Sequence, residues 1–162
     1  MSEPAADPSF GDAPPPDPIG GLDRFAYEVS FYLNAPPPRV WTSFVNEIDL
    51  WWTYRLRDRT RVVIEPKVGG NWMQVWDSGG ALFGTFTVFD PPSLLCVTGP
   101  LAMTRPAFNW LEFIFEPADT GTKLTLRHQA IGEFDADTAS IYENGWQELI
   151  GSAFYDYLQR SR

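Results

Sequence analysis

The single histidine of this sequence, His128, is the side chain best suited to both ligand binding and acid–base chemistry. Leu124, Leu126 and Ala130 share its parity, so on a strand all four side chains would point to one otherwise apolar face. An imidazole on that face can bind a ligand or act as an acid or base, because its ordinary pKa lies near neutrality. The alternative, and the commoner case, is a buried structural histidine hydrogen-bonded within the protein.

Asn109 has the same two interpretations. It falls on the parity of Leu111 and Phe113, which alternate with more polar neighbours such as Glu112. Its amide can orient a ligand by a hydrogen bond, or it can satisfy the backbone at the start of a strand. The second interpretation is the simpler one.

Aromatic residues make up 15% of the chain, with 7 Trp, 6 Tyr and 12 Phe. Trp52, Trp72, Tyr142 and Trp146 are the candidates to line a binding cavity. Each aromatic side chain buries about 150–250 Å², so packing in the core is the default role. Trp146 is the strongest candidate, because Gly145 beside it would let a helix approach a sheet or would leave a pocket open there.

Motifs for several chemistries are missing from the sequence. It has no Gly-x-Ser-x-Gly nucleophile elbow and no glycine-rich phosphate loop. One histidine and the single Cys96 argue against a zinc site built from His and Cys, so we expect no metal and no cofactor. Whether the protein is an enzyme stays open.

The charge balance argues against nucleic-acid binding. Twelve Lys and Arg against 21 Asp and Glu give a net charge of −9, which repels a polyanion. The one basic cluster alternates from Arg55 to Arg61, and on a strand it would form a solvated edge. No apolar run approaches the roughly 20 residues of a membrane span. We therefore expect a cytoplasmic domain, of unknown oligomeric state.

The elements that must position these residues follow from hydrophobic periodicity. Residues Phe25 to Leu33 alternate as a half-buried strand. The prolines Pro36–Pro38 then start a helix, and a second short turn spans Asp49 to Trp52. Six strand-like runs follow between turn signals: Arg61 to Glu65, Asn71 to Asp77, Leu82 to Phe89, Leu94 to Thr98, Phe108 to Glu116 and Thr122 to Ala130.

The last element is predicted to be one long helix, from about Ala139 to Gln159, with Asp137 or Thr138 as its N-cap. At 1.5 Å per residue it is about 30 Å long, enough to cross a sheet. Residues 1 to about 22 are rich in proline and acidic residues and are predicted to be a disordered tail. The folded domain is then 23–162.

Several short motifs in this order resemble one known family. They are Val40-Trp41, Trp51-Trp52, Glu65-Pro66-Lys67-Val68-Gly69-Gly70-Asn71-Trp72, Gly84-Thr85, Asp90-Pro91-Pro92, Gly121 to His128, and Gly145-Trp146 with Leu149. Together they resemble the START-like (SRPBCC) superfamily, with the helix-grip fold of the birch pollen allergen. Within it, they resemble the branch named after the C-terminal domain of the heat-shock-chaperone ATPase activator.

The resemblance implies an α+β helix-grip fold: a curved seven-stranded antiparallel sheet around a long C-terminal helix, with two short helices after the first strand. It also implies a hydrophobic cavity between sheet and helix that binds a small lipophilic or aromatic molecule. His128, Trp146, Tyr142, Trp52, Trp72 and Asn109 are then the candidate ligand-binding residues. The alternatives are a cavity enzyme of cyclase, dehydratase or hydrolase type that uses His128, and a chaperone-linked module that binds a protein partner.

Overall fold

The computed structural model describes residues 21–161 of the chain. Nearly all of the segment predicted to be a disordered tail lies outside these residues. Seven strands make up one sheet: β1 Asp23–Leu33, β2 Arg61–Ile64, β3 Asn71–Trp76, β4 Gly79–Asp90, β5 Leu94–Gly99, β6 Ala107–Ala118 and β7 Gly121–Gly132. The helices are α1 Pro37–Asn46, α2 Ile48–Trp51, α3 Thr138–Trp146, the π-helix η2 Gln147–Phe154, and α4 Tyr155–Arg160.

All neighbouring strands pair antiparallel, in the order β1-β7-β6-β5-β4-β3-β2. The period-2 pattern is realised as expected: Leu124, Leu126 and His128 of β7 are buried on the inner face. Arg127 between them is exposed. The predicted α+β helix-grip fold, with its seven antiparallel strands and two short helices after the first strand, is confirmed.

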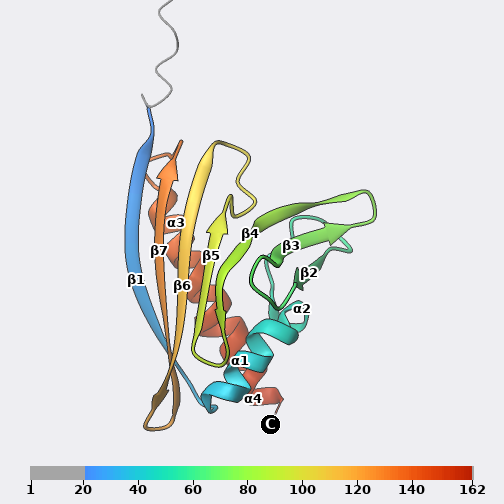
Figure 1. Ribbon diagram of the computed structural model, residues 1–162, viewed down its shortest axis with the longest axis vertical. Coiled ribbons are helices and arrows are strands. Elements are labelled where there is room, and N and C mark those ends of the chain that lie inside the picture. The colour runs from blue at the N-terminus through green and yellow to red at the C-terminus, as the bar shows by residue number, and fades with distance from the viewer. Residues whose placement is uncertain (1–20, 162) are drawn as a thin grey trace, which may run out of the picture.

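The sheet is strongly bent near the middle of β4 (Figure 1). The strand register shifts between Trp72 and Met73 on β3 and again between Phe86 and Val88 on β4, as at β-bulges. At Gly84 a Cβ would lie 2.6 Å from a Val97 methyl carbon, so only glycine allows this close approach. The bend turns β2, β3 and the first half of β4 away from the plane of the remaining strands (Figure 1).

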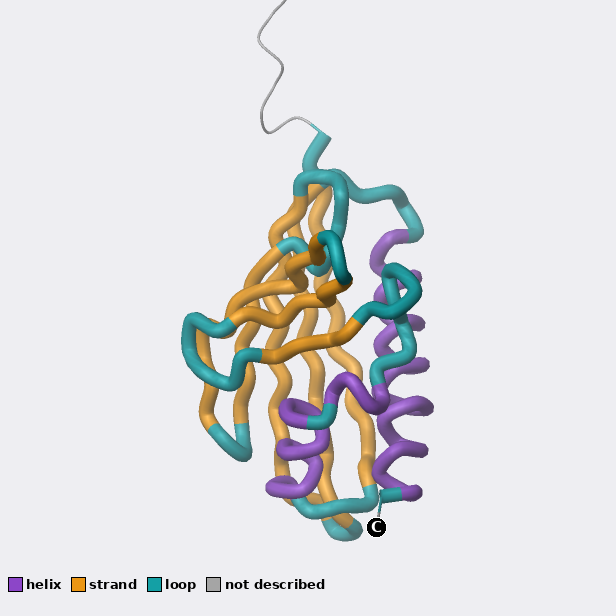
Figure 2. Tube along the Cα trace, turned by 90° about the vertical axis from the view of Figure 1, so that its right-hand side faces the viewer, coloured by secondary structure: helices purple, strands orange, loops and turns teal. Residues whose placement is uncertain are grey.

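The C-terminal segments α3, η2 and α4 follow one another without interruption and cross the inner face of the sheet (Figure 2). The predicted extent of this helix, about 139–159, is close to the observed one. Its middle differs from the expected α-helix, because Gln147–Phe154 forms a π-helix with wider turns. Gly151 lies within this segment, where the absence of a side chain lowers α-helix propensity.

Helix α1 fills one end of the space between sheet and C-terminal helix. Pro37 and Pro38 occupy its first turn, where their missing N–H groups cost nothing. Val40, Trp41 and Phe44 on its apolar face are buried in the core. Figure 2 shows α1 and α2 beside one end of the long helix, with no helix in the corresponding place at the other end.

The basic stretch from Arg55 to Arg61 is not a strand, which corrects the interpretation as an alternating strand edge. It forms a loop that becomes β2 only at Arg61. Two of its arginines have separate partners: Arg55 pairs with Asp49, and the Arg57 guanidinium lies 4.6 Å from the centre of the Trp76 ring. Within residues 21–161, no helix is long and apolar enough to cross a membrane.

Candidate functional site

A cavity of about 290 Å³ lies between α3 and the inner face of the bent sheet. The C-terminal helix contributes Ile141, Tyr142, Gly145, Trp146 and Leu149. The loop after α2, the sheet and the turn after β5 contribute the rest: Trp52, Tyr54, Leu56, Gln74, Phe83, Leu101 and Ala102. The lining is aromatic and aliphatic except for one amide and two phenol hydroxyls.

Gly145 is the position at which the helix leaves space. Beyond the helix's own backbone, a Cβ at this position would have only the Tyr54 ring within 4 Å, at 3.9 Å. The residues one turn before and after it, Ile141 and Leu149, also line the cavity. The helix therefore presents a face whose centre has no side chain, and this face forms one wall of the cavity.

Gln74, on β3, anchors the loop that forms the wall of the cavity opposite the helix. Its side chain is fully buried, accepts a hydrogen bond from the Leu56 N–H at 2.9 Å and donates to the Tyr54 carbonyl at 2.7 Å. The Trp52 indole N–H donates to the same carbonyl at 2.8 Å. These bonds satisfy backbone polar groups of Tyr54 and Leu56, which lie in a loop without a partner strand. They thereby fix the position of the side chains that this loop contributes to the cavity.

A left-handed turn closes the cavity beside β4. Leu101 and Ala102 both have positive φ angles, 48° and 57°. Their N–H groups donate to the carbonyls of Phe83 and Leu82, at 2.8 and 2.9 Å. The left-handed conformation costs about 1–2 kcal/mol for a residue with a Cβ, and these two bonds offset part of it. The buried Leu101 side chain lines the cavity as a result.

His128 lies behind this lining, in a buried network of polar side chains. Its Nε2 is 2.8 Å from Oδ1 of Asn109, whose own Nδ2 donates to the Gly99 carbonyl. Its Nδ1 is 2.8 Å from the Tyr27 hydroxyl and 3.3 Å from Nε1 of Trp146. Because the Asn109 amide uses its oxygen toward the ring, Nε2 carries the proton and Nδ1 accepts from both Tyr27 and Trp146.

This network keeps the imidazole neutral. Burial lowers the pKa of His128 from 6.5 to about 3. Burial also raises the pKa of Tyr27 well above its usual value, and the nearby Glu143 carboxylate adds to that rise. Both ring nitrogens are occupied, so His128 binds the Trp146 indole rather than a group in the cavity.

The six candidate residues therefore fall into two groups. Trp52, Tyr142 and Trp146 line the cavity. His128, Asn109 and Trp72 are fully buried in the layer behind it. The Trp72 ring lies 5.3 Å from that of Trp52, and its indole N–H has no hydrogen-bond partner among the described residues. The sequence therefore identified residues of one region, but it did not distinguish those that line the cavity from those that pack behind the lining.

Gln74 and Tyr54 were missed. Gln74 shares its parity with the apolar Trp72 on β3, and a polar residue on a buried face is the signal that would have singled it out. Tyr54 stands in an irregular loop, where no periodicity marks the inward side chains.

One carboxylate, that of Glu148, lies at the rim of the cavity: Glu148 is not itself a lining residue but is hydrogen-bonded to one. The Tyr54 hydroxyl donates a hydrogen bond to Glu148 on the C-terminal helix, and this bond raises the pKa of Tyr54. Glu148 is exposed to solvent. Burial raises the pKa of Tyr142, so both phenols in the lining are neutral at pH 7. Among residues 21–161, no three His, Cys, Asp or Glu side chains gather to hold a metal ion.

The family model described as "Activator of Hsp90 ATPase homolog 1-like protein" matches residues 34–159. The chain belongs to this family. Its match runs from the end of β1 to the end of the C-terminal helix, so it includes the whole cavity lining. The resemblance to that branch of the START-like superfamily is thereby confirmed. No curated protein matches the chain in sequence.

Solved structures of several other proteins share the fold. A protein from Rhizobium leguminosarum superposes with a TM-score of 0.67 at 18% identity, covering 86% of this chain and 97% of that one. A protein from Rhodobacter sphaeroides gives 0.63 at 19%, covering 87% and 99%. An AHSA1-like protein from Aeromonas hydrophila gives 0.60 at 17%, covering 85% and 94%. At these identities the likeness shows the fold alone.

Proposed function

We propose that this protein binds a small lipophilic or aromatic molecule in the cavity between the sheet and the C-terminal helix. The observation that carries the proposal is the cavity of about 290 Å³ at a place where the helix has a glycine. The family is one of domains with this fold, which generally bind hydrophobic ligands.

The lining has the composition expected of a ligand site. Such sites are mostly apolar, with a few polar groups that orient the ligand, and measure about 300–1,000 Å³. This cavity is at the lower end of that range, which favours a compact ligand. The Tyr142 hydroxyl, which has no hydrogen-bond partner among the described residues, is available to bind a polar group on it.

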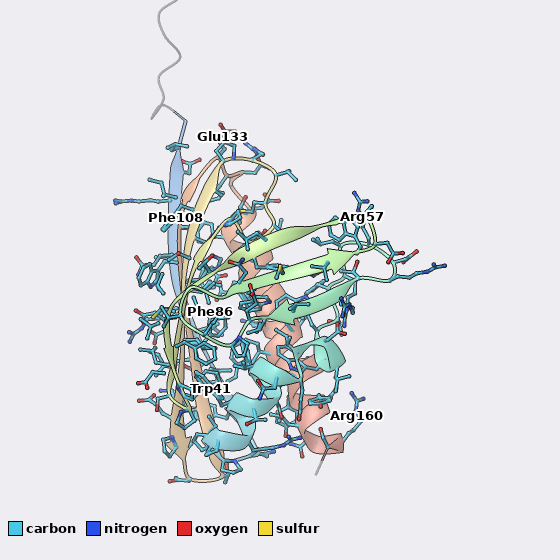
Figure 3. All side chains as sticks on the ribbon, turned by 45° about the vertical axis from the view of Figure 1, so that its right-hand side comes forward. Trp41, Arg57, Phe86, Phe108, Glu133 and Arg160 are labelled. Atoms are coloured by element: carbon cyan, nitrogen blue, oxygen red, sulfur yellow. The ribbon has the colours of Figure 1, made fainter. Side chains whose placement is uncertain are left out.

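An acid–base role for His128 has less support. An imidazole with a pKa of about 3 is neutral at pH 7, so it offers no acidic imidazolium proton and is a weak base, and Nε2 and Nδ1 are already hydrogen-bonded. The exposed apolar side chains available to a protein partner on the outer face of the sheet include Phe108 (Figure 3) and Ile131. Nothing at that surface specifies a partner, so we propose binding in the cavity.

The test is a panel of uncharged hydrophobic molecules, from single-ring aromatics to sterols, screened by thermal shift and tryptophan fluorescence. A ligand that binds the native state alone raises the melting temperature by mass action. Trp52 and Trp146 line the cavity, so their emission reports occupancy directly.

Gly145→Leu is the decisive variant, because the new side chain enters the cavity and occupies part of it. We expect it to fold and to lose at least about tenfold in affinity. Gly151→Leu is the matched control: this glycine is exposed on the same helix and outside the cavity. Equal binding by Gly145→Leu and the native protein, or no shift with any panel member, would falsify the proposal.

A further inference from the structure

We propose that the cavity selects compact aromatic molecules that carry a protonated amine, and that it rejects carboxylic acids of the same shape. This inference rests on the proposed function and names its ligand class. It follows from the aromatic faces of the lining, the charge at the rim and the absence of a basic group from the lining.

Five of the lining residues are aromatic: Trp52, Tyr54, Phe83, Tyr142 and Trp146. Aromatic rings carry a negative face, and they attract a cation within about 6 Å of the ring centre by roughly 0.5–2 kcal/mol. Trp52 and Trp146 stand edge to face, 6.1 Å apart and 75° inclined. They therefore form two walls of different orientation around one space.

The rim adds a negative charge to these walls. Glu148 is bound to the Tyr54 hydroxyl, and Tyr54 lines the cavity. An ammonium group at the rim would contact this carboxylate and the Tyr54 ring together. The chain as a whole has a net charge of −9, which draws cations toward the protein.

None of the twelve lining residues is a Lys, an Arg or a His. The nearest histidine, His128, lies behind Trp146 with both nitrogens bonded. A carboxylate brought into the cavity would lose its hydration without gaining a positive partner, which is the costly way to bury a charge.

Three arginines of the surrounding loops have partners outside the cavity lining. Arg55 pairs with Asp49, and Arg105 is close to both Glu133 and Asp135. Arg57 lies against Trp76, the last residue of β3, toward the outer tip of the β3–β4 hairpin (Figure 3). Glu148 is the charged side chain that is hydrogen-bonded to a residue of the cavity lining.

Three ligands with one skeleton test the inference: 1-naphthylmethylamine, 1-naphthalenemethanol and 1-naphthoic acid. Their dissociation constants are measured by calorimetry with the full chain at pH 7, where the amine is protonated and the acid ionised. We expect the amine to bind about tenfold more tightly than the alcohol, which equals about 1.4 kcal/mol. We expect the acid to bind at least about tenfold more weakly than the alcohol.

Two variants locate the charge that matters. Glu148→Gln should lower the preference for amine over alcohol about threefold, and raising the salt concentration should do the same in the native protein. Glu143→Gln makes the same charge change on the same helix. Like Glu148, Glu143 is outside the cavity lining, but among the described residues it has no hydrogen bond to a lining side chain, so its loss should change the preference less. The affinity for the alcohol should be unchanged in Glu143→Gln and should change less than the affinity for the amine in Glu148→Gln.

The outcomes separate this inference from the proposed function. If the alcohol binds, Gly145→Leu abolishes its binding, and the amine is no tighter or the acid no weaker, the charge selectivity is overturned while the cavity function stands. An equal effect of Glu143→Gln and Glu148→Gln overturns the role of the rim carboxylate. If neither the three ligands nor the uncharged panel binds, the proposed function fails, and this inference fails with it.

Discussion

The two ends of the space between sheet and C-terminal helix are filled differently. At the end near α4, helix α1 inserts a third layer, and its Phe44 ring packs within 5.7 Å of the rings of both Trp51 and Phe154. At the end near α3, no helix enters, and the loop after α2 and the turn after β5 close the space only at its margin. A curved sheet and a straight helix leave a gap, and a third element decides where it becomes core and where it stays open.

Truncating one phenylalanine at each end should give the largest effect. Phe44 is fully buried, and Phe44→Ala should lower the free energy of unfolding by about 3–5 kcal/mol. Phe83→Ala should cost at least about 1 kcal/mol less, because Phe83 already borders open space and has fewer contacts to lose. Urea denaturation measures both. Equal losses would show that the two ends are packed alike.

Gln74→Leu should loosen the open end and leave the filled end intact. It keeps the size of the side chain but leaves the Leu56 N–H without its acceptor, which should cost up to about 3 kcal/mol. Hydrogen exchange should accelerate at the Leu56 amide and stay slow in α1. Fast exchange in α1 as well would mean that the two ends unfold as one unit.

Because His128 is buried behind the cavity lining at the open end, it should make the free energy of unfolding depend on pH. Its pKa falls from 6.5 to about 3 on folding, so the unfolded chain takes up a proton first as the pH drops. The stability it contributes is therefore present above pH 6.5 and is lost progressively toward pH 3, by about 2 kcal/mol at pH 5.

The measurement compares the native protein with His128→Gln at pH 7 and pH 5. Glu47 and Asp49 also have lowered pKa values, but both proteins keep them, so their contributions cancel in the difference. The native protein should lose about 2 kcal/mol more than the variant over this interval. A native loss no greater than that of the variant would mean that His128 is protonated in the fold.

The smallest effect should come from Gly145→Ala. Alanine is favoured over glycine in a helix by about 1 kcal/mol, and at this position its methyl group meets open space. The variant should be more stable by about 1 kcal/mol or less and should still bind a ligand. Destabilisation in thermal unfolding would contradict the open wall at this position.

Much of the fold could be predicted because each element buries one face. The alternation along β7 and the helical stripe around Trp146 indicate their inward residues without any knowledge of the partners. The bend of the sheet could not be predicted in this detail, since it depends on the close contact of Gly84 on β4 with Val97 on the neighbouring strand β5. The π-helical turns were missed because their i+5 hydrogen bonds leave no periodic signal in eight residues.

The candidate site was predictable in kind and only partly in position. Parity identified His128 and Asn109 as inward, and both are buried, but parity cannot tell whether an inward side chain meets a cavity or another side chain. That depends on how far the opposite surface stands away. Tyr54 and Leu101 lie in irregular backbone, where the direction of a side chain follows from hydrogen bonds to distant segments.

Local periodicity is thus sufficient to predict the strands, the helices and the apolar face of each. Burial of one face requires apolar residues at regular intervals along the chain. The location of the cavity, the neutral state of the imidazole and the carboxylate at the rim come from the tertiary structure alone. They depend on contacts between residues far apart in the chain, such as Tyr54 with Glu148 and Tyr27 with His128. Such contacts form only when the sheet bends around the helix.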